Sequence, residues 1–184
     1  MRVFDRAGPD NTAETLEIAV TAAAQRSLPL VVASTRGKTA AAAIELAAPV
    51  GVRLIAVSHN YGFAKAGQQE FDPGRRAEIE RHGGYVHTGT LPLRGVGSAI
   101  RRKLGGSEEE LVNSALRIFC QGAKVCVEMA AMVADAGLIT PDQDIVAVAG
   151  TGLGADTACV VRPMPSNMLF DIRVREFLCK PGAF

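Results

Sequence analysis

The strongest constraint on the fold is an alternation of short apolar runs with segments of helical periodicity. Four such runs lie at residues 30–33, 53–58, 85–88 and 145–149, and predicted helical segments separate them. Parallel strands need long, usually helical, connections, so these four runs predict a parallel sheet. The chain is therefore expected to be an α/β protein with helices on both faces of the sheet.

A fifth apolar run reverses the direction of the chain. Residues 157–162 (TACVVR) follow the fourth run after only seven residues. A parallel crossover needs about a dozen residues or more, so this strand should run antiparallel to the fourth. The expected architecture is a single domain over residues 1–184. It is a three-layer α/β/α sandwich around a mixed five-stranded sheet whose last strand is antiparallel.

Two capping boxes mark helix starts. Asn11 with Glu14, and Ser107 with Glu110, place a capping side chain three residues before an acidic one. From Ser107 the apolar residues keep a helical spacing over residues 108–136, which predicts one long helix with a bend at Gly122.

Three polar residues share one face of that long helix. They are Lys124, Glu128 and Asp135, at positions i, i+4 and i+11. The spacing favours a solvent-exposed polar stripe with one i,i+4 ion pair.

Charge and composition argue against several classes of function. The chain has 20 Lys+Arg against 19 Asp+Glu, so it lacks the basic excess of a nucleic-acid-binding protein. No apolar run approaches the ~18–20 residues that span a bilayer, and the N-terminus lacks the apolar region of a secretory signal. We expect a cytoplasmic protein without nucleic-acid or membrane partners.

Cysteines and histidines give no sign of a metal site. No two of the four cysteines form a C-x-x-C pair, and the three histidines lack the spacing of metal ligands. Four thiols allow two disulfides, but without an export signal reduced, buried thiols are favoured.

The first of three polar segments joins the first strand to the next helix. It consists of Ser34, Thr35, Arg36, Gly37, Lys38 and Thr39. Free N–H groups and the dipole at a helix start favour an anion, and the hydroxyls and cations add donors. A Walker A loop is excluded because its first glycine would fall at Val32. The segment predicts a phosphate site, and a helix cap without ligand is the alternative.

The second segment follows the second strand and consists of His59, Asn60, Tyr61, Gly62 and Phe63. An amide and two aromatic rings could flank a flat ring of a ligand. His59 is a candidate general acid or base, although the sequence fixes no nucleophile or carboxylate near it. A structural turn, with Gly62 at positive φ and Phe63 in the core, is the alternative. Both interpretations stay open.

The third segment joins the fourth and fifth strands and contains Gly150, Thr151, Gly152 and Asp156. It reads G-x-G-x-G and precedes a strand, so it is not the G-x-G-x-x-G fingerprint that opens a helix in dinucleotide-binding proteins. It predicts a loop that approaches a ligand closely, with Asp156 accepting hydroxyl hydrogen bonds. A plain turn between strands is the alternative.

Four longer segments carry a resemblance to a known family. They are ASTRGKTA (33–40), SHNYGF (58–63), QGAKVCVEMAAMVADAGLI (121–139) and AGTGLGADTACVVRP (149–163). The chain resembles the stand-alone proteins related to the pyruvate kinase C-terminal (alpha/beta) domain, from residue 8 to residue 181. The resemblance implies the same five-stranded three-layer fold. The catalytic barrel of pyruvate kinase has no room in 184 residues, so kinase activity is not carried over.

The resemblance also implies a ligand. In pyruvate kinases activated by a sugar bisphosphate, a Ser/Thr-rich loop matching residues 34, 35 and 37–39 holds an effector phosphate. Stand-alone relatives are associated with flavin mononucleotide (FMN). That implies a phosphate on residues 34–39 and a flavin ring near residues 59–63 and 150–156. Asn60 replaces a second His of many relatives, which argues against a role that needs two imidazoles.

Three functions follow from these patterns. The first is an FMN-binding protein in the class of flavin-dependent oxidoreductases, with no catalytic residue identified. The second is a non-catalytic sensor or binding module for a small phosphorylated metabolite. The third is a structural subunit of a homo-oligomer.

Overall fold

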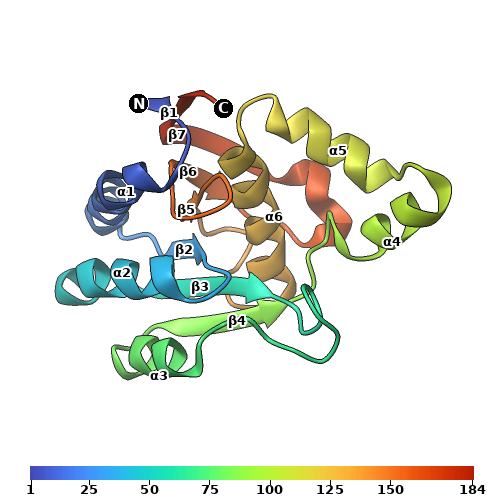
Figure 1. Cartoon of the computed structure of the whole chain (residues 1–184). Helices are drawn as coiled ribbons and strands as arrows, with labels where there is room; N and C mark the ends of the chain where they lie inside the picture. The colour runs from blue at the N-terminus through green and yellow to red at the C-terminus, as the bar shows by residue number, and fades with distance from the viewer.

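A seven-stranded mixed sheet runs through the middle of the molecule, with helices on both of its faces (Figure 1). The computed structural model describes residues 1–184. The strands are β1 (Arg2–Arg6), β2 (Leu30–Ala33), β3 (Leu54–His59), β4 (Tyr85–Gly89), β5 (Ile145–Ala149), β6 (Thr157–Arg162) and β7 (Arg173–Ala183). Their order across the sheet is β1-β7-β6-β5-β2-β3-β4. Strand β6 runs antiparallel to β5 and β7, and the other six strands share one direction.

The helices form two layers with separate hydrophobic cores. They are α1 (Thr12–Arg26), α2 (Lys38–Ala47), α3 (Pro73–Arg81), α4 (Gly95–Leu104), α5 (Glu108–Arg117) and α6 (Gln121–Asp135), with 3-10 turns η1 (Pro9–Asn11), η2 (Ala48–Val50) and η3 (Ser166–Asp171). Helices α1, α2 and α3 cover one core, which includes Val32, and α6 covers the other, which includes Val31. Neighbouring strand residues face opposite cores because of the strand pleat.

The α/β class and the five predicted strands are confirmed, but the five-stranded sheet is wrong. Strand β1 was missed because it is a polar edge strand in which only Phe4 is buried. Strand β7 was missed because its first half is charged and exposed and its second half contains Pro181, which is rare inside strands. The antiparallel strand is therefore not the last one, since β7 follows it and returns to the common direction.

The predicted long helix is two helices. Ser107 caps α5 as predicted, with its Oγ accepting from the N–H of Glu110 at 3.3 Å. However, α5 ends at Arg117, and the Sγ of Cys120 accepts from the Ala123 N–H at the start of α6. The apolar spacing continued across this break because Ile118 and Phe119, which are exposed, fall on the helical period.

Two other details of the helix predictions are wrong. Asn11 does not cap α1, because its side chain donates to the carbonyls of Arg6 and Gly8 and lies within η1. Gly122 does not bend α6. A Cβ there would lie 2.2 Å from the Oγ1 of Thr157, so this glycine lets α6 approach β6 closely.

All four cysteines are buried and free, as predicted. A hydrogen bond to Cys159 and burial raise the pKa of the Cys126 thiol well above its usual range. No helix combines the length and the apolar character needed to cross a membrane.

The role of β1 can be tested by truncating its one buried side chain. Phe4 is 3% exposed in the core between the sheet and α1, so Phe4→Ala should lower the free energy of unfolding by about 3–5 kcal/mol. Val3→Ala, at an exposed position of the same strand, should change it by less than about 0.5 kcal/mol. Equal effects of the two changes in urea denaturation would show that β1 is not part of the folded sheet.

Candidate functional site

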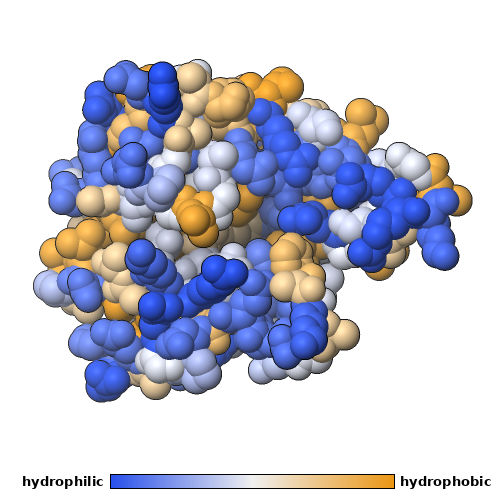
Figure 2. Space-filling view, in the orientation of Figure 1, coloured by the Kyte–Doolittle hydropathy of each residue, from blue (hydrophilic) through white to orange (hydrophobic).

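The three predicted segments meet along one edge of the sheet. Strands β5, β2 and β3 are parallel neighbours, so their carboxyl ends lie side by side. Residues 34–39 follow β2, residues 60–63 follow β3 and residues 150–156 follow β5. Open α/β sheets bind ligands beyond this edge. The surface is hollowed between these loops and the projecting helices α4 and α5 (Figure 2).

The segment after β2 carries a run of unused backbone donors. The N–H groups of residues 35–39 have no acceptor in the protein. The N–H on either side of the run is satisfied, since that of Ser34 donates to the Val57 carbonyl and that of Ala40 donates to the Oγ of Ser34. Five consecutive free N–H groups at the start of α2 form an anion-binding geometry.

Packing fixes the shape of this segment. Gly37 has φ 84°, and a Cβ on it would lie 2.9 Å from the ring of Phe71. The guanidinium of Arg75, from α3, donates to the carbonyl of Arg36 at 3.1 Å and so ties the loop to that helix. The side chains of Arg36 and Lys38 extend into solvent, whereas Ser34 and Thr39 are buried. The hydroxyl of Ser34 is thus used within the protein, by the N–H of Ala40 in the first turn of α2, which agrees with the alternative interpretation for that residue.

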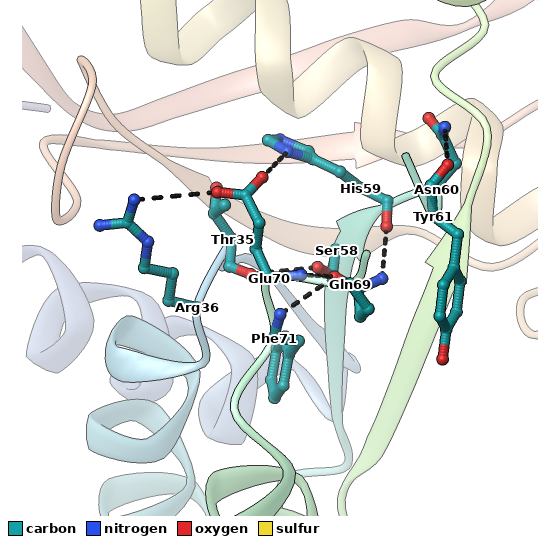
Figure 3. Close-up of polar contacts among 9 residues, drawn as sticks. All are labelled: Thr35, Arg36, Ser58, His59, Asn60, Tyr61, Gln69, Glu70 and Phe71. Carbon is teal, nitrogen blue, oxygen red and sulfur yellow. Dashed lines mark hydrogen bonds and ion pairs between the residues drawn. The ribbon is translucent and has the colours of Figure 1, made fainter. Parts of the chain in front are cut away.

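A carboxylate that the sequence did not reveal connects the first two segments. The two oxygens of Glu70 lie 3.8 Å from the Arg36 guanidinium and 3.8 Å from the Nδ1 of His59 (Figure 3). Gln69 holds Glu70 in place, because its amide oxygen accepts from the Glu70 N–H and its amide nitrogen donates to the His59 carbonyl. The sequence alone fixed no carboxylate near His59, and the fold supplies one from residue 70.

His59 is a partly buried imidazole beside a carboxylate. Its side chain is 25% exposed, and burial lowers the imidazole pKa from 6.5 against the opposing charge of Glu70. The ring packs on Phe63 with 3.9 Å between centroids. The guanidinium of Arg94 lies 5.0 Å from the centroid of the Phe63 ring.

The other residues of the second segment point elsewhere. The amide nitrogen of Asn60 donates to the carbonyl of Tyr61, and both side chains lie away from Glu70 in Figure 3. Tyr61 is 66% exposed. Gly62 has φ 80°, and Phe63 packs partly into the core under α6, as the structural interpretation predicted.

The third segment uses its polar groups within the protein. Asp156 is fully buried, and its carboxylate accepts from the N–H groups of Gly8 and Thr151 and from the Thr157 hydroxyl. A Cβ on Gly154 would overlap Thr12 and Pro9, so this glycine lets the N-terminal segment pack against the loop. The exposed part of the loop is Gly152 and Leu153.

A buried ion pair lies next to this edge. Lys124 and Glu128 form an ion pair inside the protein, and each is 1% exposed. The second oxygen of Glu128 accepts from the Leu93 N–H at 3.0 Å, and the Asn113 amide donates to the Leu93 carbonyl at 2.6 Å. Burial lowers the pKa of Lys124 despite the nearby carboxylate.

The predicted solvent-exposed stripe is therefore wrong for these two residues. The i,i+4 pair exists, but α6 is covered by the sheet on one side and by α5 on the other. One signal in the sequence pointed to burial, because residues 122–133 contain no other charged residue. Asp135, at the end of α6, is exposed and accepts from the Ser166 N–H.

Sequence reasoning missed four residues near the site, namely Gln69, Glu70, Arg94 and Leu93. They lie in loops without a periodic pattern, and only the fold brings them to the edge of the sheet. No group of three or more His, Cys, Asp or Glu side chains is arranged to hold a metal ion. No protein-family model matches the chain, so the resemblance to the pyruvate kinase C-terminal domain proteins stays a prediction.

Breaking the buried ion pair should be costly. Lys124→Met leaves a buried carboxylate without its cation and should lower the free energy of unfolding by about 3–5 kcal/mol. Lys124→Met combined with Glu128→Gln removes both charges and keeps an oxygen that accepts from Leu93, so it should recover most of that loss. Urea denaturation at pH 7 gives both values. A single variant at least as stable as the double variant would contradict the buried pairing.

The imidazole of His59 should make stability depend on pH. Its pKa is lower in the folded than in the unfolded protein, so the unfolded chain takes up the proton first. The contribution of the neutral His59 imidazole to the free energy of unfolding is therefore fully present above about pH 6.5, and it is lost as the pH falls below that value.

The measurement compares unfolding free energies at pH 7.5 and pH 5.5. The wild type should lose more stability than His59→Asn on acidification, which separates His59 from the other titrating groups. In Glu70→Gln, an NMR titration should show the His59 pKa lower still, because the carboxylate that raises it is gone. An unchanged or higher pKa would remove Glu70 from this role.

Proposed function

We propose that the protein binds FMN, with the phosphate on residues 34–39. The observation that carries the proposal is the run of five free backbone N–H groups at the start of α2. Arg36 and Lys38 extend from the same run into solvent, and Lys38 has no ion pair. Backbone donors, the helix dipole and two cations together suit a phosphate dianion.

The carboxylate of Glu70 competes with the phosphate for Arg36. Its carboxylate lies near Arg36 and carries a like charge to the phosphate. A phosphate dianion attracts a guanidinium more strongly than a single carboxylate does. In the bound state we therefore expect Arg36 to turn from Glu70 to the phosphate, and Glu70 to stay beside His59.

The ring half of the proposal rests on the second segment. The half-buried rings of His59 and Phe63 lie at the carboxyl end of the neighbouring strand, beside Arg94. Exposed Leu153 adds an apolar side chain from the third segment. When bound, a flavin would supply two-electron redox chemistry, and the proposal therefore includes a flavin-dependent oxidoreductase activity. His59, with Glu70 beside it, is the group of this chain best suited to move a proton there.

The alternative is a sensor or binding module for a small phosphorylated metabolite. Residues 34–39 favour this binding-module function, because all of their phosphate donors are in place without any contribution from residues 59–63. Asp156, which was expected to accept hydroxyl hydrogen bonds, is occupied within the protein. The ring side then offers one aromatic pair rather than a complete pocket.

The two functions separate in one set of titrations. FMN and riboflavin, which lacks the phosphate, are titrated against the protein by quenching of flavin fluorescence, with inorganic phosphate as competitor. We expect FMN to bind at least about tenfold more tightly than riboflavin, because charge-assisted hydrogen bonds to the phosphate contribute about 1.5–3 kcal/mol each. Arg36→Ala with Lys38→Ala should weaken FMN binding and leave riboflavin affinity unchanged, and the backbone N–H groups should keep part of the preference for FMN over riboflavin.

The matched control removes the same charge elsewhere. Arg53→Ala with Arg81→Ala changes two exposed, unpaired arginines at the opposite edge of the sheet and should leave FMN affinity unchanged. A protein that takes up no FMN contradicts the flavin proposal. If inorganic phosphate then still raises the melting temperature, and the rise is smaller in the Arg36/Lys38 double variant, the metabolite-binding function is supported.

A further inference from the structure

Helices α4 and α5 project from the body of the protein as an arm over residues 95–117 (Figure 1). Each has ten residues and buries only one of them, Gly97 in α4 and Asn113 in α5. By contrast, α6 buries eleven of fifteen residues. Helices shorter than about 12–15 residues are marginal in water and depend on packing against other elements. Helix α4, with Gly95 and Gly97, depends on it even more.

The arm nevertheless exposes apolar stripes. On α4, Val96, Ile100 and Leu104 are spaced four residues apart and are 71%, 36% and 79% exposed. On and just beyond α5, Leu111 and Ile118 are 74% and 72% exposed. Figure 2 shows hydrophobic atoms along the border and at the tip of the arm, among hydrophilic ones. Both helices thus carry an amphipathic pattern whose apolar side nothing in the chain covers.

The charges of the arm are complementary to each other. The last turn of α4 carries Arg101, Arg102 and Lys103, and the first turn of α5 carries Glu108, Glu109 and Glu110. Each set suits the dipole of its own helix. None of the three cations forms an ion pair within the chain, nor does Glu108 or Glu109.

We propose that the arm binds the arm of a second copy of this chain. In a two-fold arrangement, α4 of one copy lies against α5 of the other, and every contact occurs twice. The apolar stripes bury each other, and the basic end of α4 meets the acidic start of α5. A surface that carries both signs of charge side by side complements itself, whereas a membrane or an acidic partner would match only its basic half.

The first test measures the mass of the full chain in solution. Sedimentation and light scattering over a range of concentrations should show a dimer for the wild type and a monomer for Leu104→Glu with Leu111→Glu. Circular dichroism and the melting curve show whether the variant is folded. Val50→Glu, an exposed apolar position on η2, is the matched control and should remain dimeric. A wild type that stays monomeric at every concentration overturns the proposal.

The second test uses charge reversal and does not depend on apolar substitutions. Arg101→Glu with Arg102→Glu makes the last turn of α4 net acidic, and Glu108→Arg with Glu109→Arg makes the first turn of α5 net basic. Each variant alone should dimerise at least about tenfold more weakly than the wild type, and a mixture of the two should form a one-to-one heterodimer. Unchanged dimerisation of either variant, or no heterodimer, overturns the proposal. Binding of the wild-type arm to anionic vesicles, lost in the acidic variant, would identify a membrane surface instead.

Discussion

Six strands that point in the same direction determine where this protein can hold a ligand. Because β5, β2 and β3 are adjacent and parallel, segments that are about 25 and 90 residues apart in the chain end at one edge of the sheet. The strand that runs against the rest, β6, makes a short turn possible after β5. That turn, held by Asp156, is where the N-terminal segment packs. The edge is thus rigid on one side and open on the side of the segments after β2 and β3.

The two best-formed features of this edge differ in kind. At residues 35–39 the backbone supplies the donors, so their positions follow from the chain path and not from rotamers. Around His59 the side chains supply the chemistry, and Glu70 reaches the imidazole from a loop that Gln69 holds. The donors of the first feature do not depend on side-chain rotamers, whereas the second feature depends on where the side chains of Glu70 and Arg36 lie.

The buried pair Lys124–Glu128 joins the arm to the body. Glu128 accepts from the backbone of Leu93, just before α4, and Asn113 of α5 donates to the carbonyl of the same residue. Because these buried contacts hold the base of the arm, the outer faces of α4 and α5 do not have to pack in the core. Their exposed apolar stripes are therefore available for the proposed packing against the arm of a second copy.

The sequence by itself determined the elements whose signals are local. The apolar runs predicted the five strands β2 to β6, the short 150–156 connection predicted the direction of β6, and the glycine and hydroxyl pattern located the segment after β2. It did not give β1 and β7, because edge and charged strands lack an apolar pattern, nor the break before Cys120, where exposed Ile118 and Phe119 keep the helical period. Only the tertiary structure decided that Glu70 faces His59 and that Lys124 and Glu128 are buried. The burial of a side chain depends on what the rest of the chain packs over it, and spacing along one helix contains no information about that cover.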